Sequence, residues 1–242
     1  MIILQKFANI KKTLFSARRL LLNRYSLSFL YLKGNGIEIG ALHNPLKVPP
    51  RAKVRYVDRM TVADLRLQYP ELKKKKLVPV DFVADGELLE SVDDASQDFV
   101  IANHFLEHCQ NPLLALENMF RVLRAEGILY LALPDKRFTF DRERPLTSLE
   151  HLLRDYREGP EWSRPGHFLE WTCLVNGVTD PEAAQQHAEE LMAMDYSIHY
   201  HVWSQFEMLE MLHVLRQRQP MDIEVMHRRK DEVIFIIRNG AE

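Results

Sequence analysis

The chain has 242 residues, 46% hydrophobic and 27% charged, which is enough for one large domain or for one domain with an insertion. Its net charge of −2 gives no whole-chain argument for a nucleic-acid partner, and no apolar run approaches the roughly 20 residues of a membrane span. The two cysteines, Cys109 and Cys173, are too few for a disulfide framework or a zinc cluster, and they indicate reduced thiols in a reducing compartment.

Residues 1–33 carry basic charges and no acidic residue, and their apolar residues recur close to helical spacing. This pattern predicts a basic amphipathic helix as a separate N-terminal segment. Two interpretations stay open: an accessory helix packed on the domain, or a peripheral helix on an anionic membrane surface. A transit peptide has the same composition, although the segment continues into the first predicted strand without an obvious processing site.

The stretch from residue 34 to residue 58 contains two short β-branched runs, GIEIG and KVRYVD, joined by a turn rich in proline. Glu38 interrupts an apolar strand, Gly40 ends it, and Asp58 ends the next strand 18 positions later. A glycine turn followed by an acidic residue about 20 positions on is typical of a nucleotide crevice. Pro45, Pro49 and Pro50 make a full helix between the two strands unfavourable.

The rest of the chain alternates between helical and strand patterns up to residue 134, and residues 135 to about 200 then show no clear strand. A helix and two β-rich runs follow, and the two runs predict a closing antiparallel hairpin. We expect helices at 64–69, 112–123 and 204–218, strands at 37–39, 53–57, 77–83, 96–103 and 128–134, and the hairpin at 221–227 and 232–239.

The segment SQDFVIANHFLEHCQNPLLALENMFRVLRAEGILYLALPD resembles the centre of a class I S-adenosylmethionine-dependent methyltransferase. The resemblance is to the type 11-like group associated with glycan and polysaccharide biosynthesis, and it covers about residues 34–135. Its motifs here are Asp98-Phe99, Asn103-His104, Glu107-His108, Arg121-Val122-Leu123 and Gly127. It implies an α/β fold with a Rossmann-like seven-stranded sheet and a C-terminal antiparallel hairpin. The methyltransferase domain is then residues 34–242, with a mostly helical or irregular insertion at about 136–203.

The resemblance implies S-adenosyl-L-methionine as the cofactor. Glu38 matches the acid that orders the first loop, Asp58 the acid that binds the ribose, and Asp85 the residue that binds the adenine amino group. The strand end at 103–104 matches the site of the methionine part. The full set of implied cofactor residues is Glu38, Gly40, Ala41, Asp58, Asp85, Gly86, Asn103 and His104.

Two positions depart from the glycine pattern of the first motif, which here contains Leu42 and Asn44 where the family usually has glycine. A catalytically degenerate binding or scaffold protein with the same fold therefore remains the alternative function. A nicotinamide-dependent reductase is disfavoured by the Glu-His pair and the closing hairpin. A nucleic-acid methyltransferase is disfavoured by the near-neutral charge and by the sequence after the fourth strand.

Methylation of a hydroxyl requires an aligned acceptor and a base that removes its proton. The predicted insertion supplies the candidate catalytic residues His151, His167 and His199. We predict no metal ligands; the alternative is a metal held by the His199-x-His201 pair, with His167 and Glu170 as further candidates.

The leading hypothesis is an enzyme that O-methylates a sugar or another small hydroxyl acceptor in glycan biosynthesis, with no nucleic acid as partner. It would be cytoplasmic, or peripheral to the inner membrane face through its basic N-terminal segment.

Overall fold

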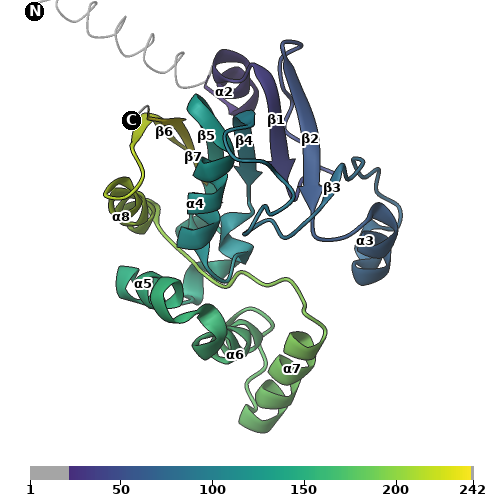
Figure 1. The fold of residues 1–242 in the computed structure, drawn as a ribbon. Coiled ribbons are helices and arrows are strands. Elements are labelled where there is room, and N and C mark those ends of the chain that lie inside the picture. The colour runs from purple at the N-terminus through teal and green to yellow at the C-terminus, as the bar shows by residue number, and fades with distance from the viewer. Residues whose placement is uncertain (1–21, 241–242) are drawn as a thin grey trace, which may run out of the picture.

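The computed structural model describes residues 22–240, and its centre is a seven-stranded sheet in the order β3-β2-β1-β4-β5-β7-β6 (Figure 1). Strands β1 to β5 pair in parallel, whereas β7 runs antiparallel to both β5 and β6. This arrangement confirms the predicted fold class. The strands are β1 (Gly34–Ile39), β2 (Ala52–Asp58), β3 (Phe82–Val83), β4 (Gln97–Asn103), β5 (Leu123–Pro134), β6 (Met221–Arg229) and β7 (Glu232–Asn239).

The helices begin where the sequence offers capping groups. The Asn111 side chain accepts a hydrogen bond from the Leu114 amide at the start of α4, with Pro112 in the first turn. Ser204 and Glu207 form a capping box at the start of α8. The helices are α2 (Arg24–Tyr31), α3 (Val62–Gln68), α4 (Pro112–Val122), α5 (Leu149–Glu158), α6 (Arg164–Leu174), α7 (Pro181–Ala193) and α8 (Gln205–Arg216).

The sheet separates two hydrophobic cores, as the alternation of side chains along β5 requires. Leu129 and Leu131 contribute to the core under α4 and α8. Tyr130 and Ala132 contribute to the opposite core, which α2 covers with Leu27 and Leu32 among others. Both faces of the sheet are buried, so side chains at the carboxyl ends of its strands are held in fixed positions, as a binding site requires.

The sheet differs from a standard α/β unit in two places: the link between β1 and β2, and the length of β3. Residues 40–51, between β1 and β2, form no helix in the described chain, as the prolines predicted. The strand expected at 77–83 is reduced to Phe82–Val83. Pro79 has no amide hydrogen to donate to a neighbouring strand. The Tyr56 amide of β2 donates to the Asp81 carboxylate at 2.8 Å, whereas in a longer strand pair it would donate to a backbone carbonyl.

The insertion, which is residues 136–203, follows β5 and contains α5, α6 and α7. Figure 1 shows these helices below the carboxyl ends of the parallel strands. They have a small core of their own that includes Phe168, Leu191 and Ile198. A bridge between Asp135 and Trp203 joins the two ends of the insertion. The prediction of a mostly helical insertion after the fifth strand is therefore confirmed.

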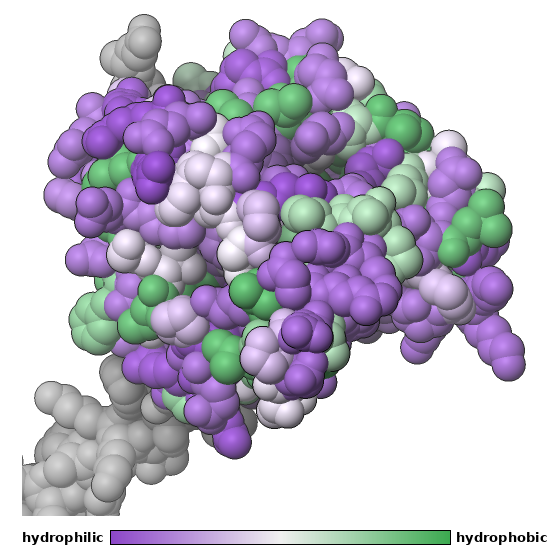
Figure 2. All heavy atoms as spheres, turned by 90° about the horizontal axis from the view of Figure 1, so that it is seen from below, coloured by the Kyte–Doolittle hydropathy of each residue, from purple (hydrophilic) through white to green (hydrophobic). Residues whose placement is uncertain are grey.

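The surface seen from below, where the insertion lies, is mostly hydrophilic with small separate hydrophobic groups (Figure 2). Of the basic segment predicted at 1–33, residues 1–21 lie outside the described residues, and α2 is the helix within the described part. Among the described helices, none combines the length and the apolar character needed to cross a bilayer.

Candidate active site

Three cavities follow one another along the carboxyl edge of the parallel strands, with volumes of about 480, 380 and 180 Å³. The first and second share Gly40 and His104, and the second and third share His108 and Ser197. They therefore form one continuous crevice at the place where open α/β sheets bind ligands. The predicted cofactor residues all line this crevice: Glu38, Gly40, Ala41, Asp58, Asp85, Gly86, Asn103 and His104.

A larger cavity, of about 690 Å³, lies at the other edge of the sheet. Gly34 and Asp98, from the amino ends of β1 and β4, line it. Because ligands of such sheets bind beyond the carboxyl ends of the strands, we place the candidate site in the crevice.

The Glu38 carboxylate organises the loop at one end of the crevice. Its two oxygens accept the Leu46 amide at 2.9 and 3.1 Å, and burial raises the pKa of this carboxyl to about 7. Within the loop, Gly40 has a φ of +64° and Leu42 a φ of +49°. Leu42 thus adopts the left-handed conformation that favours glycine, so the path of the loop is kept without the second glycine of the motif.

Asn103 and His104 form the end of β4 in the first cavity. Both polar atoms of the Asn103 amide are buried; the amide nitrogen interacts with the Glu38 carboxylate, and the amide oxygen has no hydrogen-bond partner among the described residues. His104 has a φ of +50°, an uncommon conformation for a residue with a side chain. Unpartnered polar atoms and backbone strain are both features of ligand sites, and here they occur at adjacent positions.

Two cationic side chains, each paired with an acid, lie at the same end of the crevice. Although burial lowers the pKa of His104, hydrogen bonds to Glu107 and Glu232 raise it to about 9. The ring nitrogens lie 3.5 Å from Glu107 Oε1 and 3.1 Å from Glu232 Oε2. Arg24, on α2, also pairs with Glu232 and lines the first cavity. Arg24 was absent from the predicted site, because it lies in the basic segment and far from any motif.

The other end of the crevice is shaped by Asp58 and by the turn after β3. Burial raises the pKa of Asp58 to about 6, although the backbone amides of Arg59 and Met60 bind its carboxylate. Asp85 Oδ1 accepts the Glu87 amide at 2.7 Å. A Cβ atom on Gly86 would lie 2.5 Å from Phe105 Cζ, so glycine is required at this close approach.

The insertion closes over the crevice through the segment from Asp195 to Ser197. Asp195 pairs with Arg59, which follows Asp58, and with Arg164 of α6. Tyr196 and Ser197 then line the second cavity. A single loop of the insertion thus forms one wall of the crevice.

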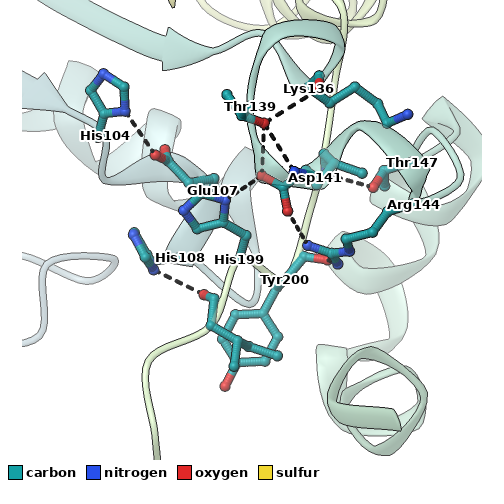
Figure 3. A network of polar contacts seen from close by, with 12 residues as sticks. His104, Glu107, His108, Lys136, Thr139, Asp141, Arg144, Thr147, His199 and Tyr200 are labelled. Atoms are coloured by element: carbon teal, nitrogen blue, oxygen red, sulfur yellow. Dashed lines mark hydrogen bonds and ion pairs between the residues drawn. The ribbon is translucent and has the colours of Figure 1, made fainter. Parts of the chain in front are cut away.

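His199 lies close to the crevice and is held by an acid (Figure 3). Its Nδ1 is 2.8 Å from Asp141 Oδ2, and Asp141 Oδ1 accepts Arg144 Nη1 at 2.9 Å. In the neutral ring, an Nδ1–H donated to Asp141 leaves the lone pair on Nε2. The sequence offers Asp141 only as one of several polar candidates in the insertion, because an aspartate in an irregular segment has no distinctive spacing.

Glu107 and His108 lie beside His199, and the three residues offer ligand atoms within 4.8 Å of one another. His108 lines the second and third cavities, and its Nδ1 lies 2.9 Å from the Ile198 carbonyl oxygen, so that Nε2 is left unprotonated. Burial lowers the pKa of His108, so the imidazole is neutral. Glu107 is fully buried, and among the described residues its carboxylate is approached by His104, whose Nδ1 lies 3.5 Å from Oε1.

His151 and His167 lie together elsewhere, and neither lines the three cavities of the crevice as the described residues form it. Their Nε2 atoms are 3.1 Å apart, and Asp155 and His201 complete the group. Burial and the neighbouring His151 lower the pKa of His167 to about 4. His199 does not line these cavities either, but its ring packs against that of His108, which does, with 4.7 Å between the ring centroids. The structure therefore places His199 nearer the crevice than the other two predicted catalytic histidines.

The alternative pairing of His199 with His201 on one strand face is not formed. The two residues belong to different groups, because residues 195–202 are irregular and the two-residue period of a strand does not apply. Glu170, proposed beside His167, instead accepts Arg144 Nε at 2.8 Å.

Comparison with known proteins gives a family model described as a methyltransferase domain, which matches residues 37–131. No curated protein matches the sequence. A SAM-dependent methyltransferase structure from Methanosarcina mazei is 16% identical, with a TM-score of 0.50, and the match covers 91% of this chain and 100% of that one.

A second structure, from Rhodobacter sphaeroides, is provisionally described as a Zn-dependent alcohol dehydrogenase. It is 15% identical, with a TM-score of 0.50, and the match covers 91% of this chain and 88% of that one. The chain spans 50% of a further match, the CurJ carbon methyltransferase, at 12% identity and a TM-score of 0.46 over 87% of this chain.

At such low identity, the first two structures establish the fold and say nothing of the substrate. Residues 37–131 thus match a methyltransferase domain, and the chain shares its fold with the SAM-dependent methyltransferase from Methanosarcina mazei. The matched residues run from β1 to β5 and so contain most of the crevice.

Proposed function

We propose that the crevice binds S-adenosylmethionine and that the protein O-methylates a hydroxyl of a sugar or another small acceptor. The observation that carries the proposal is the continuity of the crevice. Residues predicted from separate motifs, from β1 to the end of β4, line three adjoining cavities. An extended nucleoside joined to an amino acid has the shape and chemistry that such a crevice accommodates.

The residues present fit the cofactor at both ends. The buried amide of Asn103 has its oxygen free for the methionine part, and the cations of Arg24 and His104 suit its carboxylate. Asp58 would accept the ribose hydroxyls. Gly86, which lines the third cavity, would offer its backbone amide to the adenine. Bound S-adenosylmethionine supplies a methyl group on a sulfonium ion, which needs no further activation by the protein.

His199 is the proposed general base. Asp141 orients its ring, and Glu107 and His108 lie beside it. In the proposed reaction, His199 Nε2 accepts the proton of the acceptor hydroxyl while its oxygen attacks the methyl carbon. Tyr69 and Tyr196 line the second cavity, where aromatic rings suit the apolar faces of a sugar.

A glycan acceptor is the finer part of this proposal. It rests on the resemblance of the first motif, EIGALHNP, and on the aromatic lining of the second cavity. The basic residues of the N-terminal segment would place the enzyme at an anionic membrane face, where lipid-linked sugars are available. The exposed Phe29 and Leu30 of α2 suit the same contact.

Transfer of a radiolabelled methyl group tests the proposal. Wild-type protein is incubated with labelled S-adenosylmethionine and a panel of activated sugars and simple hydroxyl acceptors. We expect transfer to at least one sugar and a loss of about 10²–10⁴-fold in kcat for His199→Gln, the contribution of a positioned base. His187→Gln, an exposed histidine on α7, should leave the rate unchanged.

Different negative results would refute different parts of the proposal. Transfer to nitrogen acceptors alone would refute O-methylation, and an unchanged kcat in His199→Gln would refute its role as base. Cofactor binding without transfer to any acceptor would favour the degenerate binding protein.

A further inference from the structure

Three histidines and one aspartate converge at the base of the insertion, apart from the crevice residues. His151 and Asp155 are four residues apart on α5 and so share a helix face. His167 comes from α6 and His201 from the segment that leads to α8. Each offers one ligand atom, and these four atoms all lie within 4.8 Å of one another.

We propose that these residues form a binding site for a structural zinc ion. His151 Nε2 lies 3.1 Å from both His167 Nε2 and Asp155 Oδ2, and His201 Nε2 lies 3.6 Å from the same oxygen. Tetrahedral ligands about 2.0–2.1 Å from zinc lie roughly 3.3 Å from each other, which these separations approach. Imidazole nitrogen and carboxylate oxygen are both ordinary zinc ligands.

A hydrogen-bonded cluster without metal accounts poorly for the same contacts. Asp155 Oδ2 is fully buried and accepts no hydrogen bond, although His151 Nε2 is 3.1 Å away. The ring of His201 is also fully buried. A buried acceptor is costly when unsatisfied, and a cation beside Asp155 Oδ2 removes that cost.

Neighbouring residues contact the proposed ligands and fix their orientation, as hydrogen-bonding and packing neighbours do in zinc sites. Ser163 Oγ donates to Asp155 Oδ1 at 2.9 Å, which fixes the carboxylate and leaves Oδ2 for the ion. His201 Nε2 also lies 3.3 Å from the Gln110 carbonyl oxygen, and the ring gives up this hydrogen bond when the nitrogen loses its proton and binds zinc. The ring of Trp203 stacks on His201, and that of Trp162 lies against His151.

Four protein ligands, two of them fully buried, are typical of a structural site, since catalytic zinc keeps one position open. The ligands come from α5, α6 and the chain that returns to the sheet at Trp203. A zinc ion here would therefore fix the insertion, including the loop that closes over the crevice. This inference does not rest on the proposed reaction.

The test measures zinc in the full-length protein prepared without a histidine tag. The protein is incubated with zinc sulfate, passed through a desalting column and analysed for metal. We expect one zinc ion per chain in the wild type and a loss of at least about tenfold in zinc affinity for Asp155→Asn and His167→Gln, the lower end of losses for ligand-shell changes. His187→Gln should bind zinc as the wild type does.

His199→Gln distinguishes this site from the group formed by Glu107, His108 and His199. Retention of zinc in His199→Gln assigns the ion to the site proposed here, and its loss would overturn the assignment. Wild type that retains no zinc, or zinc unaffected by Asp155→Asn and His167→Gln, would equally overturn it.

Two further measurements use only the wild-type protein, so they do not depend on whether the variants fold: cobalt absorption spectroscopy and the melting temperature. Wild-type protein loaded with Co²⁺ should show the intense visible absorption of a tetrahedral ion, and competition with zinc should abolish it. Chelation should lower the melting temperature by more than about 4 °C, and added zinc should restore it. A melting temperature unaffected by chelation of a zinc-loaded sample would contradict a structural role.

Discussion

Gly86 occupies a position in the crevice where a side chain has no room. A Cβ atom there would lie 2.5 Å from Phe105 Cζ and 2.8 Å from Ile39 Cγ2, whereas one on Gly166 would meet nothing within 4 Å. We expect Gly86→Ala to lower the free energy of unfolding by about 1–3 kcal/mol, the usual cost of overpacking. Gly166→Ala, within α6, should be neutral or stabilising. Urea denaturation of both variants measures the difference, and equal stabilities would refute the close approach.

His104 should make stability depend on pH in a defined window. Its pKa is raised from 6.5 to about 9 by Glu107 and Glu232, so its contribution is fully present below pH 6.5 and is lost as the pH rises to 9. Wild-type protein should therefore lose more stability between pH 6 and pH 9.5 than His104→Asn does. Chemical denaturation at both pH values checks this. A steeper loss in His104→Asn would contradict the assignment.

Among single residues, the sequence predicted the crevice residues that belong to a motif of fixed spacing. Glu38, Gly40 and Asp58 could be predicted from the order of a strand, a turn and a second strand. The roles of Arg24 and Asp141 could not be predicted in this way, because their partners Glu232 and His199 are distant in sequence and only the fold brings each pair together. The three predicted catalytic histidines could not be sorted for the same reason. Their assignment depends on how the irregular insertion is packed.

The loop around Asp195 is the element that joins the insertion to the crevice. Asp195 pairs with Arg59 and Arg164 on an exposed surface, so Asp195→Asn should change the free energy of unfolding by less than about 1 kcal/mol. Local exchange should respond more strongly, because these pairs hold the loop closed. We expect faster amide hydrogen exchange over residues 194–198.

Arg154→Gln provides the matched control for this prediction, since Arg154 forms an exposed pair with Glu158 away from the crevice. It should have a similar effect on global stability and none on exchange at 194–198. Equal exchange at 194–198 in wild type, Asp195→Asn and Arg154→Gln would show that Asp195 does not hold the loop.

Among the elements, long periodic segments were predicted well and short or irregular ones were not. α4 and β5 bury continuous apolar patterns, so local sequence and packing agree. β3 is short because Asp81 and Pro79 change its pairing. The helices of the insertion carry many charges, and their pattern did not separate helix from loop before the fold was known.

For the whole molecule, the N-terminal segment tests the proposed membrane contact. Residues 1–21 contribute five basic residues, Lys6, Lys11, Lys12, Arg18 and Arg19, and no acid. Deletion of residues 2–21 leaves α2 and Arg24 in place. It should reduce binding to vesicles that contain anionic lipid, an effect that high salt should mimic in the full chain. Sedimentation with vesicles measures this, and unchanged binding after the deletion would remove the segment as the membrane contact.

The central claim is that the crevice binds S-adenosylmethionine, and calorimetric titration with S-adenosylhomocysteine tests it most directly. Wild type and Asp58→Ala are titrated in parallel, with Asp93→Ala, an exposed aspartate outside the crevice, as control. We expect micromolar binding by the wild type and by Asp93→Ala, and a loss of at least about tenfold, or 1.4 kcal/mol, in Asp58→Ala. No binding by the folded wild type would contradict the account, and equal binding by Asp58→Ala would place the cofactor elsewhere.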